Sequence, residues 1–184
     1  IGEKMNNKKR CRWCNMQNPL YIKYHDEEWC KQNFDEKYLF EMLLLESFQA
    51  GLSWECVLNK RKAFEEAYDN FNIDKISHYD KAKIQELLSN EKIIRNKFKI
   101  NASINNAQIF KKIQGEYGSF HDYLITFTNN KTFYEIDQTT SELSDNISKD
   151  LKKKGMKFVG STIIYSYLQA IGVIYSHDKG CFLY

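Results

Sequence analysis

The sequence predicts a mainly α-helical protein, and three observations favour this fold class. Apolar residues recur at helical spacing through almost all of the 184 residues. No series of segments shows the strict alternation of apolar and polar residues that is typical of half-buried strands. The chain contains one proline, Pro19. A chain of this length is able to bury a sizeable core, and we expect residues 1–184 to form one domain.

Helices are expected in chain order at residues 36–50, 53–68, 74–89, 96–115, 119–127, 141–154 and 161–171. The segment NNKTFYEIDQTTSELSD, residues 129–145, is the one long polar connection. It has no enrichment in Gly, Pro or Ser, so we interpret it as a loop and not as a linker between domains. The sequence shows no internal repeat and no low-complexity segment.

Composition limits the possible partners only weakly. The net charge is +3 and the pI is about 8.5, which permits a nucleic-acid partner without requiring one. Aromatic residues make up 15% of the chain, so their rings must fill the core or form stacking surfaces.

The sequence indicates a cytoplasmic location. No apolar run is long enough to cross a bilayer, so we expect no membrane contact. The N-terminal segment IGEKMNNKKRCRWC lacks the apolar centre of a secretion signal. We expect Met5 to be the natural start, with four residues before it left over from cloning, and residues 1–10 to be flexible.

The cysteine pattern indicates metal binding rather than disulfides. The chain has five cysteines, an odd number, and a reducing compartment disfavours a disulfide framework. His177 and Cys181 lie four residues apart near the C-terminus, where a chain frays unless something holds it. Both side chains are suited to zinc. Spacing rules alone would add Cys11 and Cys14, a Cys-x-x-Cys pair, to give a Cys3His site.

The segment SELSDNISKDLKKKGMKFVGSTIIYSYLQAIGV predicts a helix-hairpin-helix at about residues 142–172. Apolar residues keep helical spacing up to Gly155, and a short turn containing Gly160 leads into a second helix. Such a turn presents backbone N–H groups at a helix N-terminus, which would hold a DNA phosphate without reading sequence. The surrounding lysines are Lys152, Lys153, Lys154 and Lys157. An ordinary helical corner with solvent-exposed lysines would give the same pattern.

Glu46 lies in the segment YLFEMLLLESFQAGLSWE, on the same side of its expected helix as Leu39, Met42 and Leu43. An ionised acid beside an apolar stripe is costly unless it has a partner, so Glu46 is a candidate for binding a polar or cationic ligand. A buried Lys or Arg partner, or a capping role for Glu46, would explain the same pattern, with Trp54 as a core residue.

Four stretches together carry a resemblance that covers about residues 11–181. They are CRWCNMQNPLYIKYHDEEW, LFEMLLLESFQAGLSWECVLNKR, IIRNKFKINASINNA and ISKDLKKKGMKFVGSTIIYSYLQAIGVIYSHDKGC. In their order and spacing they resemble the DNA-3-methyladenine glycosylase I family of the helix-hairpin-helix glycosylase superfamily. The resemblance implies that superfamily's fold and a single catalytic domain.

The resemblance also implies an activity. Enzymes of this family flip 3-methyladenine out of double-stranded DNA and hydrolyse its N-glycosidic bond, which leaves an abasic site. They are monofunctional and usually act as monomers. Carried over by position, the base-contacting glutamate is Glu46, the stacking tryptophan is Trp54, and the other pocket aromatics are Tyr24 and Trp13. Because methylation at N3 makes the adenine a cation, aromatic faces and a carboxylate would both favour it.

The resemblance also indicates which residues would contact DNA. The turn AGLSW makes Leu52 the candidate wedge that fills the gap left by the flipped base, against the alternative of a plain core leucine. Phosphate contacts are expected in the hairpin, at Gly155, Lys157 and Gly160.

The resemblance places the ligands of one structural zinc ion at Cys11, His25, His177 and Cys181, with no role for Cys14. This ion would join the two ends of the chain. Two departures stand beside these motifs: Arg12 replaces a small residue, and Cys30 replaces a common glycine.

Two other classes of function are compatible with parts of the sequence. A non-catalytic, zinc-stabilised helix-hairpin-helix module would bind DNA but would not need a carboxylate beside Tyr24 and Trp54. A helical domain that binds small molecules or proteins would explain the aromatic residues, but it would not need the segment KKKGMKFVG.

Overall fold

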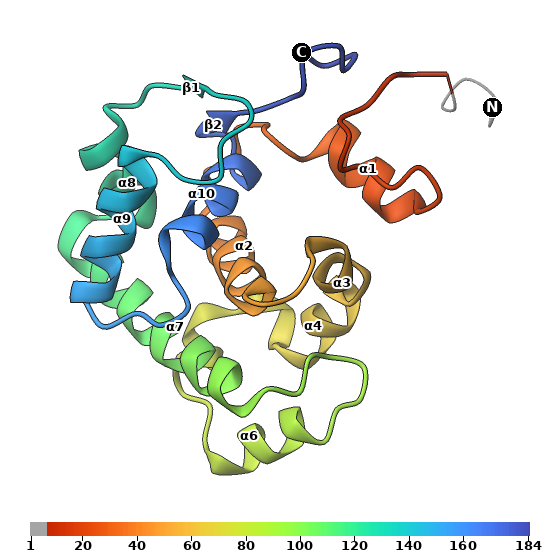
Figure 1. Cartoon of the computed structure of the whole chain (residues 1–184). Helices are drawn as coiled ribbons and strands as arrows, with labels where there is room; N and C mark the ends of the chain where they lie inside the picture. The colour runs from red at the N-terminus through yellow and green to blue at the C-terminus, as the bar shows by residue number, and fades with distance from the viewer. Residues whose placement is uncertain (1–6) are drawn as a thin grey trace.

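The computed structural model describes residues 7–184 and is mostly helical (Figure 1). Its helices are α1 (Pro19–Glu27), α2 (Glu36–Gln49), α3 (Trp54–Asn59), α4 (Arg61–Ala67), the 3-10 helix η1 (Asp69–Phe71), α5 (Ile73–Ser77), α6 (Lys81–Leu88), α7 (Lys97–Tyr117), α8 (Phe120–Thr128), α9 (Glu142–Lys153) and α10 (Ser161–Ala170). Two short strands, β1 (Phe133–Tyr134) and β2 (Ile174–Tyr175), pair in parallel. The mainly α-helical prediction is therefore confirmed, with one small strand pair that was not predicted.

Two of the expected helices are each divided in the structure. The helix expected at 53–68 is two helices, α3 and α4, which meet at Lys60. Val57 and Phe64 are both buried, so the apolar spacing continues across this break and hides it in the sequence. The helix expected at 74–89 is also divided, because Asp80 adopts an extended backbone and its side chain accepts a hydrogen bond from the Lys83 N–H.

Further elements were missed, among them α1 and β1. Helix α1 has ordinary start signals, since the Asn18 side chain caps it and Pro19 occupies its first position. Strand β1 lies within the segment expected to be a loop. It pairs with β2 through backbone bonds from the Phe133 N–H to the Val173 carbonyl, 2.9 Å, and from the Glu135 N–H to the Tyr175 carbonyl, 3.1 Å. These contacts join distant segments, and no local pattern reveals them.

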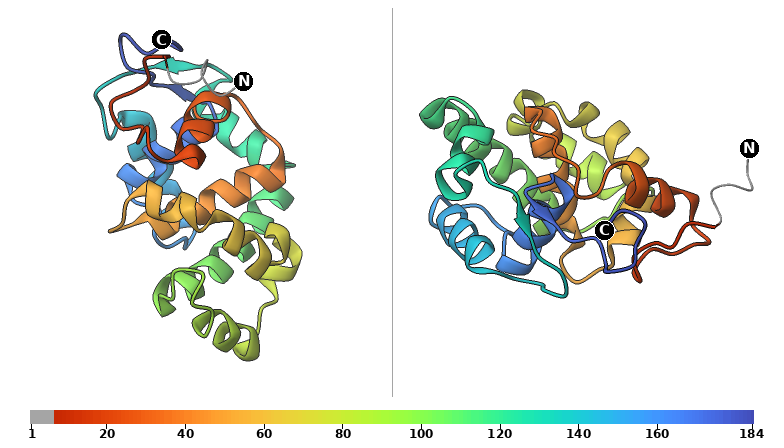
Figure 2. Two further views of the ribbon diagram at one scale, coloured as in Figure 1. Left: turned by 90° about the vertical axis from the view of Figure 1, so that its right-hand side faces the viewer. Right: turned by 90° about the horizontal axis from the view of Figure 1, so that it is seen from above.

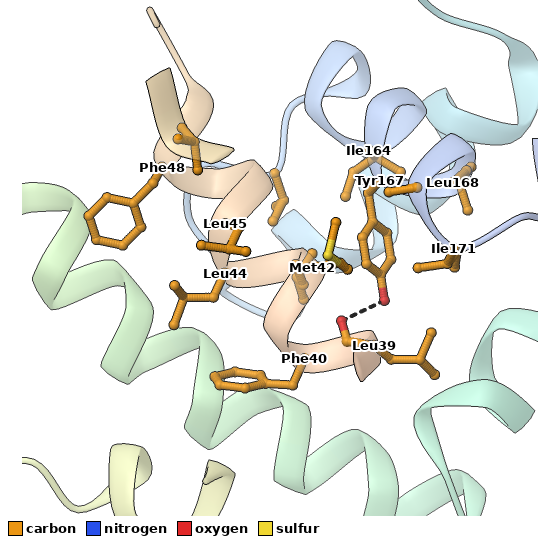
Figure 3. Packing of buried hydrophobic residues seen from close by; sticks show 14 of the residues in the cluster. Leu39, Phe40, Met42, Leu44, Leu45, Phe48, Ile164, Tyr167, Leu168 and Ile171 are labelled. Atoms are coloured by element: carbon orange, nitrogen blue, oxygen red, sulfur yellow. Dashed lines mark hydrogen bonds between the residues drawn. The ribbon is translucent and has the colours of Figure 1, made fainter. Parts of the chain in front are cut away.

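Helix α2 forms the centre of the core (Figures 1 and 3). Its buried residues lie on every side of the helix, and they include Leu39, Phe40, Met42, Leu43, Leu44, Leu45 and Phe48. Such a helix is buried all round rather than amphipathic. Helix α10 packs against it, and the Tyr167 hydroxyl donates a 2.9 Å hydrogen bond to the Leu39 carbonyl. Glu46 on α2 is consequently held inside the protein.

The two ends of the described chain lie at the same end of the molecule, opposite α6 (Figures 1 and 2). A 2.8 Å backbone hydrogen bond from Phe182 to Lys9 joins them. Met5 lies outside the described residues, as does most of the expected flexible segment 1–10. Within the rest of that segment Arg10 is buried, and its guanidinium donates to both carboxylate oxygens of Asp26, at 2.7 and 2.6 Å. Among residues 7–184 no helix has the length and apolar character needed to span a membrane.

Candidate active site

A cavity of about 300 Å³ lies beside the C-terminal half of α2. Four predicted site residues line it: Trp13 from the loop before α1, Tyr24 from α1, Glu46 from α2 and Trp54 from the start of α3. The structure thus brings together side chains that are separated by up to 41 positions in the sequence. A pocket of this size is large enough for a single base-sized ligand.

Glu46 is the acid of this cavity. It is 2% exposed, and its Oε2 atom has no hydrogen-bond partner within residues 7–184. Glu46 also forms no salt bridge in the described chain, so the alternative of a buried Lys or Arg partner is wrong. Burial raises the pKa of its carboxyl well above the usual range. A buried polar atom without a partner is costly, and here it faces a cavity that a ligand can enter.

Aromatic rings form the walls. The rings of Tyr24 and Trp54 lie 5.3 Å apart between centroids, at 46° to one another. Trp13 is half-buried and contacts Tyr21 and Trp29, with centroid distances of 5.1 and 4.7 Å. Burial, followed by the nearby charge of Glu46, raises the pKa of Tyr24 well above its usual range. Tyr24 therefore stays neutral at physiological pH and keeps its O–H as a donor.

Four potential metal ligands gather where the chain ends meet. Cys11, His25, His177 and Cys181 are all buried, and their ligand atoms lie within 4.8 Å of one another. Nδ1 of His177 is 3.4 Å from the Cys11 sulfur and 3.6 Å from the Cys181 sulfur. Nε2 of His25 is 3.5 Å from the Cys181 sulfur. This is the ligand set implied by the resemblance. Cys14, which spacing rules favoured, is buried but is not a member of the group.

The surroundings of these four side chains suit bound thiolates. The N–H of Asp178 donates to the Cys11 sulfur at 3.2 Å, and the N–H of Leu183 donates to the Cys181 sulfur at 3.4 Å. Burial lowers the pKa of His177 to about 4, so its imidazole is neutral at physiological pH. Neutral imidazoles and thiolates are the forms that bind zinc.

The turn between α9 and α10 carries the predicted phosphate contacts. Gly155 has a φ of +99°, a conformation that favours glycine. Gly160 precedes the first residue of α10, and no side chain among residues 7–184 caps this helix. The backbone of Lys157 is already engaged, because its N–H donates to Asn106 Oδ1 at 2.9 Å while Nδ2 of Asn106 donates to its carbonyl. Of the predicted residues in this turn, Lys157 can therefore offer only its exposed side chain.

Leu52 lies in the turn between α2 and α3 and is 42% exposed. The alternative of a plain core leucine is thereby excluded. Gly51 before it has a φ of +77°, which lets the chain reverse at the end of α2.

Comparison with known proteins identifies the family. The family model described as methyladenine glycosylase matches residues 13–184, nearly the whole chain. The chain belongs to the methyladenine glycosylase family. It is therefore a DNA glycosylase, an enzyme that hydrolyses the bond between a base and its sugar.

Individual relatives match over nearly their whole lengths. The DNA-3-methyladenine glycosylase 1 of Escherichia coli (strain K12) is 41% identical over 182 residues, which cover 95% of this chain and 96% of the relative. A crystal structure of 3-methyladenine DNA glycosylase I superposes with a TM-score of 0.90 at 39% identity, covering 95% of this chain and 98% of that one. A tyrosine-to-phenylalanine variant of such an enzyme, solved in complex with 3-methyladenine, gives a TM-score of 0.89 at 34% identity, with coverage of 94% and 96%.

Sequence reasoning missed several polar residues in the pocket of this methyladenine glycosylase, and Gln49 is the one next to Glu46 on α2. Gln49 lines the cavity one helical turn after Glu46, and its Oε1 atom is buried without a hydrogen-bond partner in the described chain. The signal was present, since residues three apart share a helix face. Glu46 and Gln49 together offer oxygen acceptors to a ligand that carries N–H groups.

The rim of the glycosylase pocket was also missed. Arg12 is exposed and lines the cavity, and its guanidinium contacts Asp137 at 2.5 Å and Asp178 at 3.3 Å. The N–H of Arg12 donates to Asp178 at 2.7 Å. Arg12 thus links three separate segments at the mouth of the pocket.

Proposed function

We propose that this glycosylase removes 3-methyladenine from alkylated double-stranded DNA, and that Glu46, Tyr24, Trp54 and Trp13 hold the flipped-out base. The observation that carries this proposal is the buried Oε2 atom of Glu46, which has no hydrogen-bond partner among residues 7–184 and lies at a cavity walled by aromatic rings. The names of the relatives support the same substrate. The pocket residues come from one chain, and we propose that a monomer acts.

The chemistry of the damaged base explains the composition of the pocket. Methylation at N3 leaves the purine in DNA positively charged. The faces of Trp54, Tyr24 and Trp13 attract a cation, and the effect is larger in a desolvated site. Glu46 gains the partner that it otherwise lacks, because its carboxylate can accept from the exocyclic amine and oppose the positive charge. Unmodified adenine is neutral and gains less from both contacts, which provides selectivity.

The same charge lowers the demand on catalysis. When the N-glycosidic bond breaks, its electron pair goes to the purine, which leaves as a neutral molecule without needing a proton. Water adds to the sugar and loses a proton, and the product is an abasic site. Positive charge develops on the sugar as the bond breaks, and an ionised Glu46 stabilises it. We assign the orientation of the attacking water to Glu46, directly or through the bound base.

We propose that Leu52 enters the base stack when the nucleotide flips out. Its exposure of 42% supports this role, because the side chain is available without rearrangement of the core. The turn from Gly155 to Gly160 would hold a phosphate as part of a helix-hairpin-helix. The uncapped N-terminus of α10 and the exposed side chains of Lys152, Lys153 and Lys157 support this contact.

We propose that Cys11, His25, His177 and Cys181 hold one structural zinc ion. The donor set fits the metal: zinc–sulfur bonds of about 2.3 Å and zinc–nitrogen bonds of about 2.0 Å in a tetrahedron require sulfur–nitrogen distances of about 3.5 Å. Three of the four sulfur–nitrogen pairs in the group lie 3.4, 3.5 and 3.6 Å apart. Four protein ligands leave no position for water, so the ion would hold the two chain ends beside the pocket and take no part in the reaction.

The alternative weighed from the sequence, a non-catalytic DNA-binding module, would share the zinc group and the hairpin. The retained cavity argues against it, because burying Glu46 without a partner costs stability that a simple DNA binder has no reason to lose.

Release of free 3-methyladenine from methylated double-stranded DNA tests the proposal. We expect release by the wild type, strong suppression by Glu46→Gln with DNA binding retained, and no effect of Glu66→Gln, an exposed glutamate on α4. Mass spectrometry of the same samples is expected to find one zinc ion per chain. A folded, zinc-loaded wild type that binds DNA but releases no base would favour the binding module.

A further inference from the structure

Phe98 is an aromatic ring that the fold leaves in water. It is the second residue of α7 and is 79% exposed, whereas the rings of Phe40, Phe48 and Phe110 are 1% exposed or less. A single exposed ring needs no explanation by itself. Its position between two features of the proposed DNA-binding face does require one.

The start of α7 is attached to the turn that carries Leu52. Lys99, the residue after Phe98, is buried, and its Nζ donates to the carbonyls of Phe48 and Ala50 at 2.9 and 2.5 Å. Both carbonyls lie at the C-terminal end of α2, and Leu52 follows Ala50 by two residues. Phe98 and Leu52 are therefore exposed apolar side chains on two adjoining segments.

The same helix reaches the α9–α10 turn. Nδ2 of Asn105 donates to the Gly155 carbonyl at 2.9 Å. Asn105 follows Phe98 by seven residues, nearly two helical turns, so both side chains lie on one stripe of α7, about 10 Å apart along its axis. Phe98 consequently lies on the side of α7 that meets the proposed phosphate-binding turn. Leu52, Phe98 and that turn belong to one continuous face.

Positive charge surrounds the ring. Lys92, Arg95 and Lys97 are exposed, and Glu91 is the one acidic residue between Ser89 and Gly115 in the sequence. Arg95 and Lys97 stand directly before the first turn of α7 and within it. An exposed aromatic ring flanked by basic side chains fits a nucleic acid, because bases stack on the ring while phosphates pair with the cations.

We infer that Phe98, Arg95 and Lys97 form a second DNA contact, on the strand opposite the damaged base. When the damaged nucleotide flips out, the base that it paired with loses its partner, and Phe98 stacks on that base beside the inserted Leu52. Arg95 and Lys97 bind the phosphates of the same strand. The inference rests on the proposed function for the ligand, double-stranded DNA, and for the face that binds it.

The test measures binding without excision. The probe is a fluorescein-labelled duplex with a tetrahydrofuran abasic-site analogue, and binding is followed by fluorescence anisotropy. We expect Phe98→Ala to weaken binding about tenfold, because stacking on one base is lost. Phe98→Trp, which keeps an aromatic ring at this position, should bind as tightly as the wild type. The slope of log affinity against log salt concentration is negative for DNA binding. Arg95→Ser and Lys97→Ser should each make it less steep by about 1.

Tyr134→Ala is the matched control, since Tyr134 is 78% exposed on β1, at the opposite end of the molecule from α6 (Figure 1). It should leave binding unchanged. Phe98→Ala should also leave base release from methylated single-stranded DNA unchanged, because no complementary strand is present. Binding of Phe98→Ala within twofold of the wild type, or equal losses in single- and double-stranded DNA, would overturn the inference. A wild type that releases no 3-methyladenine but binds the duplex through Phe98 would instead contradict the proposed function alone.

Discussion

Oδ1 of Asp26 lies 2.8 Å from Nδ1 of His25, and this contact orients the imidazole toward the metal-ligand group. With Nδ1–H donated to the carboxylate, Nε2 carries the lone pair; it accepts from the Cys11 N–H at 3.3 Å and lies 3.5 Å from the Cys181 sulfur. Asp26 is itself held by the two hydrogen bonds from Arg10. A chain of three side chains thus connects the first part of the described chain to the proposed zinc site.

Asp26→Asn should weaken metal binding without removing a ligand. The amide is neutral and accepts less strongly from the imidazole, so we expect zinc affinity to fall by about 10- to 100-fold. Competition with a chromogenic chelator measures the affinity. Asp122→Asn on α8, an acid without a role near the site, serves as control. Unchanged affinity in Asp26→Asn would contradict the assigned role of the carboxylate.

The two ligand sets considered from the sequence are separated by a pair of substitutions. We expect Cys11→Ser to lose zinc binding, and we expect Cys14→Ser to retain one zinc ion per chain because Cys14 is outside the group. Metal content by mass spectrometry and thermal unfolding with and without a chelator measure both outcomes. Loss of zinc in both variants would favour the Cys-x-x-Cys pair, because that set also includes Cys11.

The sequence predicted the residues of the site better than the contacts between segments that are distant in the chain. Burial of Glu46 followed from its place on an apolar stripe, and the resemblance assigned the ligand set by position. Gln49 was overlooked although helical spacing placed it beside Glu46. The bond between the Lys157 N–H and Asn106 could not be anticipated, because it joins segments 51 positions apart and leaves no local pattern. The break at Lys60 stayed hidden for a different reason, because apolar spacing continues across it from Val57 to Phe64.

The backbone at Gly172, just after α10, packs closely against the backbone of Gln32. Gly172 lies in the segment that leads from α10 to His177. Gly172 has a φ of +82°, and a Cβ atom there would lie 2.3 Å from the Gln32 nitrogen. Gly172→Ala should destabilise the protein by about 3 kcal/mol or more, because both the backbone and the neighbouring segment would have to move.

Gly115→Ala is the control for this substitution. Gly115 lies inside α7, and a Cβ atom there meets nothing within 4 Å. We expect a gain of about 0.5–1 kcal/mol from higher helix propensity. Urea unfolding measures both variants, and a similar effect of the two substitutions would contradict the close approach at Gly172.

The buried carboxyl of Glu46 makes the stability of the ligand-free protein depend on pH. Its pKa in the folded state is raised above the ordinary value of 4.5, because burial penalises the charged form. Full stability is therefore present below about pH 4.5 and is lost as the pH rises toward the folded-state pKa, by at most about 1.4 kcal/mol for each pH unit.

Glu46→Gln removes this loss, because glutamine stays neutral at every pH. The variant should therefore exceed the wild type in free energy of unfolding by an amount that grows from about pH 5 to about pH 7, as urea denaturation at each pH would measure. Glu66→Gln should show no such growth. A constant difference between Glu46→Gln and the wild type across this range would mean that Glu46 is already ionised in the free pocket. The cationic base would then meet a preformed carboxylate, and its binding would not have to be coupled to the release of a proton from Glu46 to water.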